Sequence, residues 1–450
     1  MIASVASIAD LVELGVAHLQ TGPFGSQLHS YDYVPNGVPV VPTEAIRERR
    51  IDREVCPQIS LSKATDLSRH RLVAGDILFA RRGVQATGHI GVVREAEEGF
   101  ICGTGAIRLR IAATNEVVCS EYLSHLLADP TSIAWFKFHA IGATMPNLNE
   151  GIIRSFPLKL PSLEYQVEVA AFLSAVDDKM ELNRRMNETL EAMAQAIFRD
   201  WFVDFGPVRR KLAGETDPVA IMGGITSDLA RAAELAALFP TALGENDLPE
   251  AWTESTLGEK TMAVLGGTPS RKVAEYWDGS VPWINSGAVN EFRITKPSEL
   301  ITEQGLSKSA AKLLPRRTTV LAITGATLGQ VSLTEIETSA NQSVVGLVPK
   351  GSLPPEFVYL WVMETIDEIV ARQTGGAQQH VNKGNVEEQR VLSPPKAVLD
   401  AWSEFVVPLF DRIASGCFES HALAETRDYL LPRLMSGRVR IGEIGREIAQ

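Results

Sequence analysis

The sequence has few cysteines, no long apolar run and no recognisable leader, and each absence narrows the class of protein. Its four cysteines are scattered, without a CxxC spacing or a histidine at ligand distance. We therefore expect free thiols in a reducing cytoplasm and no metal site. No apolar run reaches the ~18 residues of a membrane-spanning helix. The first residues, MIASVASIADLVELG, lack a basic region ahead of an apolar one, which disfavours a signal peptide.

The motifs of common catalytic centres are also missing. The loop TGATLGQ (324–330) lacks the Lys and the hydroxyl that follow the last Gly of a P-loop. There is no HExxH, no GxSxG, no Gly-rich methyl-donor loop and no Asn-Pro-Pro-aromatic tetrapeptide. We predict that the chain carries no catalytic residues. The alternative is an enzyme with an unrecognised site, such as a nuclease, and the purified chain would then cleave or methylate DNA by itself.

The net charge of −12 argues against nucleic-acid binding only when the charge is averaged over the whole chain. The excess of Asp and Glu lies within residues 161–250, and the segments on either side are nearly balanced. An acidic helical segment is a poor DNA ligand but a good spacer or protein-binding face. Whole-chain charge therefore does not exclude DNA binding by the flanking segments.

Two long helices are predicted from apolar or small residues that recur at alternating steps of four and three. This spacing is typical of a coiled-coil seam, and an ordinary surface helix rarely sustains it. The seam positions in the first helix are Val169, Leu173, Val176, Met180, Asn183, Asn187, Leu190, Ile197 and Trp201. Those in the second are Val406, Leu409, Ile413, Leu423, Leu430 and Leu434.

The chain is an internal repeat, because adding 233 to a residue number in the first helix region leads to its counterpart in the second. The same shift pairs Asn149 with Asn382 and Pro161 with Pro394. Each half thus ends in a long helix, and one amphipathic helix cannot bury its stripe alone. We expect the two helices to pack together, with Asn183 near Gly416; the alternative is that each helix packs only on its own domain.

The predicted fold is α+β, with two similar domains of mixed β-sheet and helices, each followed by a long helix, in a pseudo-two-fold repeat. The predicted boundaries are a first domain over 1–161, a long helix over 162–204, a connector over 205–250, a second domain over 251–395, a second long helix over 396–436 and a tail over 437–450. The connector should hold one short helix, from Asp228 to Leu238, between Gly and Pro breakers.

Both domains present the same polar loops with different side chains, which indicates duplication followed by divergence in what is recognised. Arginine can neutralise phosphates or bind guanine, and Asn and Gln suit adenine edges. A surface Arg can also be merely solvated, and Asn149 and Asn382 can serve as local turn residues instead. The predicted DNA-binding residues are Gly25, Ser26, Gln27, Arg47, Arg49, Arg50, Arg81, Arg82, Asn147, Asn149, Arg271, Lys272, Thr327, Gln378, Gln379, Asn382 and Lys383.

The order of these segments resembles the specificity (S) subunit of a type I restriction-modification system over essentially the whole length. The resemblance rests on TGPFGSQL, GDILFAR, NLNEGIIRSFPLKLP, FRDWFVDFGPVRRK, NQSVVGLVP, GGAQQHVN and RDYLLPRLMSG, duplicated around two helices. The first repeat's NLNEG lacks the glutamines of GGAQQHVN. A methylation-only or other phage-defence complex of the same fold is one alternative, and a coiled-coil scaffold without a DNA role is another.

The resemblance implies a division of labour among subunits. The two domains would be target-recognition domains, and the two long helices would form an antiparallel coiled-coil spacer between them. Each recognition domain would read one half of a bipartite site in double-stranded DNA, and the helices would set the gap and dock two methyltransferase (M) subunits. The M subunits would carry S-adenosylmethionine and flip out an adenine for methylation. Restriction (R) subunits using ATP and Mg²⁺ would join for cleavage, and this chain would bind no cofactor.

Overall fold

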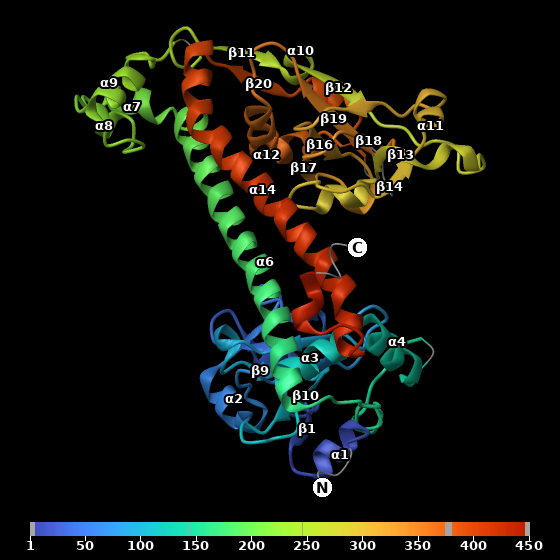
Figure 1. Ribbon diagram of the computed structural model, residues 1–450. Helices are drawn as coiled ribbons and strands as arrows, with labels where there is room; N and C mark the ends of the chain where they lie inside the picture. Colours follow the sequence, from blue (N-terminus) through green and yellow to red (C-terminus); the bar gives the residue numbers. More distant parts are fainter. Residues whose placement is uncertain (1–4, 143, 245, 374–379, 446–450) are drawn as a thin grey trace. The chain divides into compact units, whose positions relative to one another are not determined.

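The computed structural model describes residues 5–142, 144–244, 246–373 and 380–445. The chain divides into two compact units, one of Met1–Lys179 with Leu423–Gln450 and one of Met180–Ala422. Both long helices therefore begin in one unit and end in the other (Figure 1). The predicted α+β fold with an internal repeat is confirmed.

The first unit contains two four-stranded sheets. One has the strand order β1-β10-β7-β8 and is antiparallel throughout; the other has the order β2-β6-β3-β9 and pairs β3 with β9 in parallel. The bounds are β1 Ala17–Thr21, β2 Tyr33–Val34, β3 Val38–Val41, β6 Gln58–Ile59, β7 Ile77–Ala80, β8 Ile90–Val92, β9 Ile101–Cys102 and β10 Ala106–Ile111. A small hairpin joins β4 Ile46–Arg47 to β5 Arg50–Ile51.

The strand β7 is apolar at all four positions because both of its faces are buried. Ile77 and Phe79 face a core shared with α1 (Ile8–Glu13), α3 (Ser120–Ala128), α4 (Pro130–His139) and α5 (Glu150–Arg154). Leu78 and Ala80 face a second core toward the other sheet. Alternate residues of a strand point to opposite faces, so a strand covered on both sides is apolar throughout.

The second unit repeats this topology. Its sheets have the orders β12-β19-β16-β17 and β14-β13-β18-β15, with β13 and β18 again parallel. The bounds are β12 Thr261–Leu265, β13 Trp277–Ile284, β14 Glu299–Ile301, β15 Leu313–Leu314, β16 Thr319–Ala322, β17 Val331–Leu333, β18 Thr338–Ala340 and β19 Val344–Pro349. The helix α12 (Pro355–Ala371) packs on the first of these sheets through Phe357 and Val358, and β11 (Thr253–Thr256) pairs with β20 (Arg390–Ser393).

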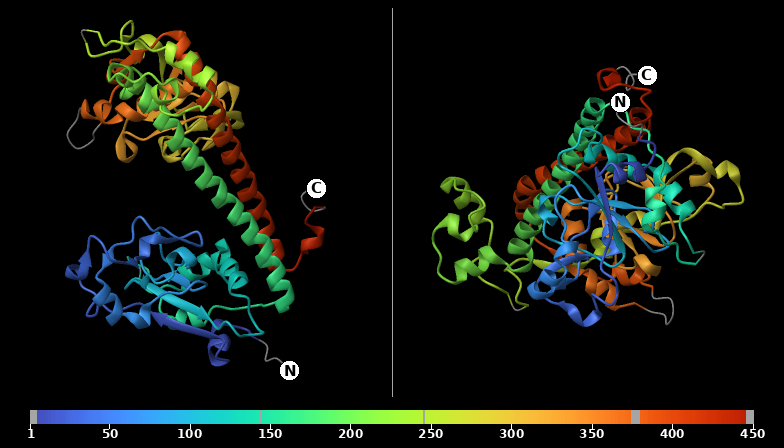
Figure 2. Two further views of the ribbon diagram at one scale, coloured as in Figure 1. Left: turned by 90° about the vertical axis from the view of Figure 1, so that its left-hand side faces the viewer. Right: turned by 90° about the horizontal axis from the view of Figure 1, so that it is seen from below.

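The two long helices, α6 (Leu163–Phe198) and α14 (Lys396–Met435), run antiparallel and side by side (Figures 1 and 2). In the first unit, Leu173 shares a core with Leu430 and Leu434. In the second unit, the Asn183 side chain donates to Ser420 Oγ at 3.2 Å, and Asn187 donates to Cys417 Sγ at 3.3 Å. The seam side chains are buried or half-buried, and the alternative of two separately packed helices is wrong.

The segment predicted as a connector is a packed helical insert of the second unit. It forms α7 (Gly206–Leu212), α8 (Pro218–Ile221) and α9 (Leu229–Ala237), of which only α9 was predicted. Pro207 and Pro218 lie in the first turns of α7 and α8, where the missing N–H costs nothing because it would have no helical partner. Val208, Met222 and Leu235 join the core of the unit. Two of the presumed breakers therefore begin helices.

Candidate nucleic-acid interface

Three loops of the first unit leave one edge of the sheet β1-β10-β7. They follow β1, precede β10 and follow β7, because Thr21 pairs with Ile107 and Ala106 pairs with Ala80 in antiparallel register. The segment 144–149 joins them, since the Leu148 N–H donates to the Arg81 carbonyl at 2.7 Å. Four polar segments, 22–29, 81–89, 103–105 and 144–149, thus meet where β1 and β7 end and β10 begins. We call this end of the sheet the reading edge.

The second unit builds the same edge from equivalent contacts. The Gly266 N–H donates to the Val344 carbonyl at 3.0 Å, as the Gly22 N–H does to the Ala106 carbonyl at 2.9 Å. The Val381 N–H donates to the Ile323 carbonyl at 3.0 Å, in the place of the Leu148 contact. The reading edges therefore share a backbone framework and differ in their side chains.

A glycine permits the closest backbone approach at both edges. A Cβ added to Gly22 would lie 1.9 Å from the Gly103 carbonyl oxygen, and one added to Gly266 would lie 2.1 Å from the Asn341 carbonyl oxygen. No side chain tolerates such a distance. Only glycine at positions 22 and 266 therefore lets the loop after β1 or β12 pack against the turn that precedes the paired strand, β10 or β19.

Among the residues predicted for the first edge, the structure separates exposed groups from supporting ones. Gly25, Ser26 and Arg82 are exposed. Arg81 is half-buried, and its Nε donates to Asn147 Oδ1 at 3.0 Å and to the Leu148 carbonyl at 3.2 Å. Arg81 and Asn147 thus hold the last loop against the first three.

The structure corrects the prediction for Arg49. Its side chain is 9% exposed and forms ion pairs with Asp177 and Glu121, so the guanidinium is not available to a phosphate. Arg47, on the same hairpin, has a side chain that is 63% exposed and pairs with Asp52 at 2.6 Å. Arg50 is half-buried. The three arginines of this hairpin therefore have different environments, although they lie within four residues of one another.

Asn149 and Asn382 both act as helix N-caps. The Asn149 side chain accepts a hydrogen bond from the Ile152 N–H at 2.9 Å, and Asn382 accepts one from the Asn385 N–H at 2.9 Å. They begin α5 and α13 (Lys383–Glu387), respectively. The local structural role considered for them is thus present in both repeats, while both side chains stay exposed.

The other residues predicted in the second unit have varied surroundings. Arg271 stacks over Trp277, 3.6 Å from the ring centroid, and forms two hydrogen bonds to the Glu299 carboxylate. Lys383 pairs with Glu387 at 3.3 Å. Lys272 is exposed, and Thr327 is half-buried in the loop after β16. Gln378 and Gln379 lie outside the described residues.

Comparison with known proteins identifies this arrangement. The family model described as "Type I restriction modification DNA specificity domain" matches residues 33–192 and 249–399, which is more than half of the chain. The chain belongs to this family. The specificity-subunit family recognises DNA and does not catalyse, so the predictions of the family and of a non-catalytic DNA-recognition chain are confirmed.

Individual relatives agree with the family assignment. The chain is 28% identical over 359 residues to the HindI specificity subunit of Haemophilus influenzae, covering 72% of this chain and 78% of that one. It is 23% identical over 332 residues to the MjaIX specificity subunit of Methanocaldococcus jannaschii, covering 73% and 71%. The crystal structure of an S subunit from M. genitalium has the same fold, with a TM-score of 0.55 at 14% identity over 95% of this chain and 94% of that one.

Sequence reasoning missed three residues at the reading edges of this specificity subunit. Thr104 lies in the turn before β10, Gln342 lies in the turn before β19, and Thr268 lies in the loop after β12. The signal that would have found them is the repeat itself, because Cys102 and Ala340 occupy equivalent places on parallel strands. Thr104 and Gln342 each follow two residues later.

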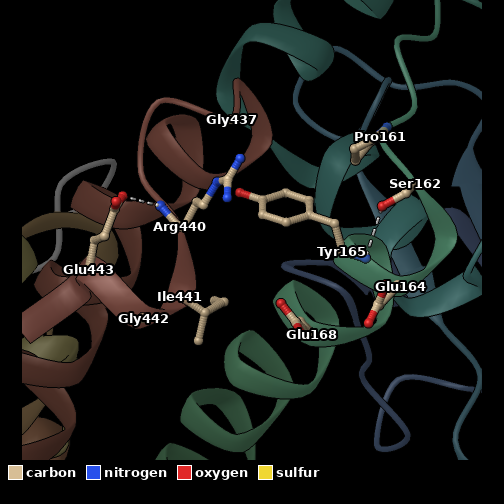
Figure 3. Close-up of a pocket in the computed structure, with 10 residues that line it drawn as sticks. All are labelled: Pro161, Ser162, Glu164, Tyr165, Glu168, Gly437, Arg440, Ile441, Gly442 and Glu443. Atoms are coloured by element: carbon tan, nitrogen blue, oxygen red, sulfur yellow. Dashed lines mark hydrogen bonds between the residues drawn. The ribbon is translucent and has the colours of Figure 1, made fainter.

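A cleft of about 810 Å³ in the first unit lies away from these residues. It opens between the start of α6 and the segment 437–443, and Tyr165 reaches across it (Figure 3). The Tyr165 hydroxyl lies 3.0 Å from the carbonyl oxygens of Leu434 and Val439 and donates to one at a time. None of the predicted DNA-binding residues lines this cleft, so we assign Tyr165 a structural role.

Other site types find no support in the described part of the specificity subunit. All four cysteines are free thiols, and burial raises the pKa of Cys56 and of Cys417 to about 11. No group of three or more His, Cys, Asp or Glu side chains is placed there to hold a metal ion. Among the described residues, every helix is too short or too polar to span a bilayer.

Proposed function

We propose that each reading edge recognises one half of a bipartite site in double-stranded DNA. The observation that carries this proposal is the duplication: four loops meet at the same sheet edge in both units through equivalent backbone contacts, but they carry different side chains. A fixed framework with variable tips suits the recognition of two different sequences. The exposed Arg, Asn and Thr side chains supply donors and acceptors for base edges and phosphates.

The proposal extends to the helix pair and to partners. We propose that α6 and α14 set the gap between the two half-sites and dock two methyltransferase subunits. The buried seam residues hold the helices to each other, so a docking face would have to use the outer, exposed side chains, such as Leu182 and Met193. The methyltransferase subunits would carry S-adenosylmethionine, and restriction subunits using ATP and Mg²⁺ would bind that complex in the cytoplasm.

Methylation mapping tests the central proposal. The chain is co-expressed with its methyltransferase subunits in a host that has no other adenine methylation, and the modified adenines are located by single-molecule sequencing. We expect one motif made of two short half-sites around an unread gap. Methylation at one continuous motif, or at sites without a shared motif, would contradict the proposal.

A variant of each edge sharpens the test. Substituting Thr327→Ala together with Lys272→Ala should alter methylation through the second half-site and leave the first half-site as it was. Substituting Ser26→Ala should affect at most the first. The exposed Gln304→Ala, on α11 (Glu303–Ser307) outside the reading edge, is the matched control and should change neither half-site.

A further inference from the structure

The turns that precede β10 and β19 occupy the same place in the two repeats. Val41 pairs with Cys102 and Ile284 pairs with Ala340, in both cases between parallel strands. The strands that follow also correspond, since Ala106 pairs with Ala80 and Val344 pairs with Ala322. Thr104 and Gln342 are therefore equivalent positions, each at the tip of a turn within its reading edge.

In the first unit, this turn anchors an arginine. Arg82 Nη2 donates to Thr104 Oγ1 at 3.2 Å, and the Arg82 side chain is exposed. Within the described residues, no carboxylate lies within ion-pair distance of Arg82, in contrast to Arg47 and Arg271. One N–H of the guanidinium is held by a neutral hydroxyl, and the other four remain for a ligand.

In the second unit, the same turn carries a glutamine instead. Thr268 Oγ1 donates to Gln342 Oε1 at 2.5 Å, and both residues are exposed. The hydrogen bond orients the amide and leaves both N–H donors and one lone pair of Oε1 for a ligand. Each edge thus presents one planar, multivalent side chain that a threonine holds in place.

The two side chains differ in the base that they suit. A guanidinium binds the O6 and N7 acceptors of guanine with two parallel hydrogen bonds, and a carboxamide binds the N6 donor and N7 acceptor of adenine. We propose that Arg82 reads a guanine in one half-site and that Gln342 reads an adenine in the other. Thr104 and Thr268 act as positioning residues. This inference rests on the proposed function, namely that the reading edges face DNA.

The test is the base preference at one position of each half-site, measured with the assembled methyltransferase complex on DNA libraries. Gln342→Ala should lower discrimination for adenine at a single position of one half-site by roughly 10- to 100-fold and leave the other half-site unchanged. Arg82→Ala should act in the same way on a guanine of the other half-site. Gln304→Ala is again the control.

Conservative variants separate base reading from other roles. Arg82→Lys keeps the charge but loses the planar fork, so it should lose guanine preference while retaining most affinity. Thr268→Ser should keep adenine preference and Thr268→Val should weaken it, since only Ser preserves the donor. An equal loss of affinity for all sequences in Arg82→Ala, with unchanged base preference, would mean that Arg82 contacts a phosphate and would overturn the inference.

The outcome is distinguishable from failure of the proposed function. If the wild-type complex shows no bipartite motif, the proposed function itself is wrong. If the wild type shows the motif and the variants, shown to be folded by thermal unfolding and by assembly with the methyltransferase, keep every base preference, only the assignment of Arg82 and Gln342 is wrong.

Discussion

Arg49 and Asp177 form a buried ion pair that ties the β4–β5 hairpin of the first recognition domain to α6. Arg427 of α14 approaches the same carboxylate at 3.1 Å, so that one acidic side chain joins the domain to both helices. The second unit uses the same device, with Arg293 paired to Glu191 of α6 and Arg317 paired to Asp411 of α14. In each unit, ion pairs between arginine and carboxylate side chains hold the recognition domain to the helix pair.

We predict that Asp177→Ala destabilises the first unit by about 3 kcal/mol, because it leaves the buried Arg49 without one of its two carboxylates. The measurement is denaturant unfolding, with Asp178→Ala as the matched control. Asp178 is the exposed neighbour on the same helix, and its loss should change stability by less than about 0.5 kcal/mol. An effect of Asp177→Ala as small as that of Asp178→Ala would show that the buried Arg49 does not depend on this carboxylate.

The buried His125 predicts a loss of stability in mild acid. Burial, and then the nearby charges of Arg49 and Arg427, lower the pKa of His125 to about 2. The unfolded imidazole titrates near a pKa of about 6.5. Above that pH neither state binds the proton and the group has no effect. Below it only the unfolded state does, so stability falls as the pH is lowered, by up to about 1.4 kcal/mol per pH unit.

Unfolding free energies measured between pH 7.5 and pH 5 check this pH dependence. His125→Asn should flatten the decline, and the same change at the exposed His139 controls for the general loss of an imidazole. A wild-type slope that His125→Asn leaves unchanged would assign the acid sensitivity to other groups.

Substitutions at Asn382 can separate its role as a helix N-cap from a role in base recognition. Asn382→Ala should cost about 1 kcal/mol through loss of the cap, and Asn382→Ser should restore most of it, since a hydroxyl also caps. If Asn382 is only a cap, Asn382→Ser keeps full discrimination between cognate and mismatched second half-sites. If it also reads a base, discrimination falls by about 1–3 kcal/mol even with the cap restored.

We predict that Gln378 and Gln379 contact bases of the second half-site. Replacing both with Ala should weaken binding of the cognate second half-site by about 1–3 kcal/mol per lost base contact, without disturbing complex assembly. Binding to cognate and mismatched DNA measures the change. Unchanged discrimination in the double variant would remove both glutamines from the set of base readers.

We predict that Arg47 contributes to DNA affinity independently of the DNA sequence. Its exposed guanidinium pairs only with Asp52 among the described residues, and an exposed ion pair of this kind is worth little. Arg47→Ala should therefore weaken binding to all DNA sequences alike and reduce the salt dependence, in log–log form, by about 1. An unchanged salt slope would place Arg47 outside the DNA contact.

We predict that the length of the helix pair sets the number of base pairs between the two half-sites. A heptad adds about 10 Å of helix, or roughly three base pairs of duplex. Insertion after Asn187 and after Ser420 preserves the seam but separates Asn183 from Ser420, which are in contact. Insertion after Arg185 and after Cys417 keeps both this contact and the contact of Asn187 with Cys417.

Methylation mapping of the double insertion measures the result. We expect unchanged half-sites and a gap longer by about three base pairs. An active variant with an unchanged gap would show that the helices do not set it. A changed half-site sequence would show instead that the helices contribute to base reading.

Periodicity and repetition are properties of the sequence, and they predicted the internal repeat and the two long helices, although not the helices α7 and α8 of the insert. The alternation of four and three from Val169 to Trp201 requires an apolar partner stripe, and its copy after residue 396 is the one available. The run Ile77–Ala80 can be buried only in a sheet covered on both faces. Residue type alone left Asn149 and Asn382 open between a local turn role and a base contact, and the structure shows that both cap a helix.

Which polar side chains remain free was decided only by the tertiary structure. Arg49 and Arg82 are alike in sequence, each beside another arginine next to a strand. Arg49 is buried because Asp177, 128 residues away, meets it in the fold. Arg82 stays exposed because the turn at Thr104 offers it a hydroxyl and no carboxylate. A side chain's availability depends on neighbours brought together by long-range packing, and no local pattern in the sequence encodes those neighbours.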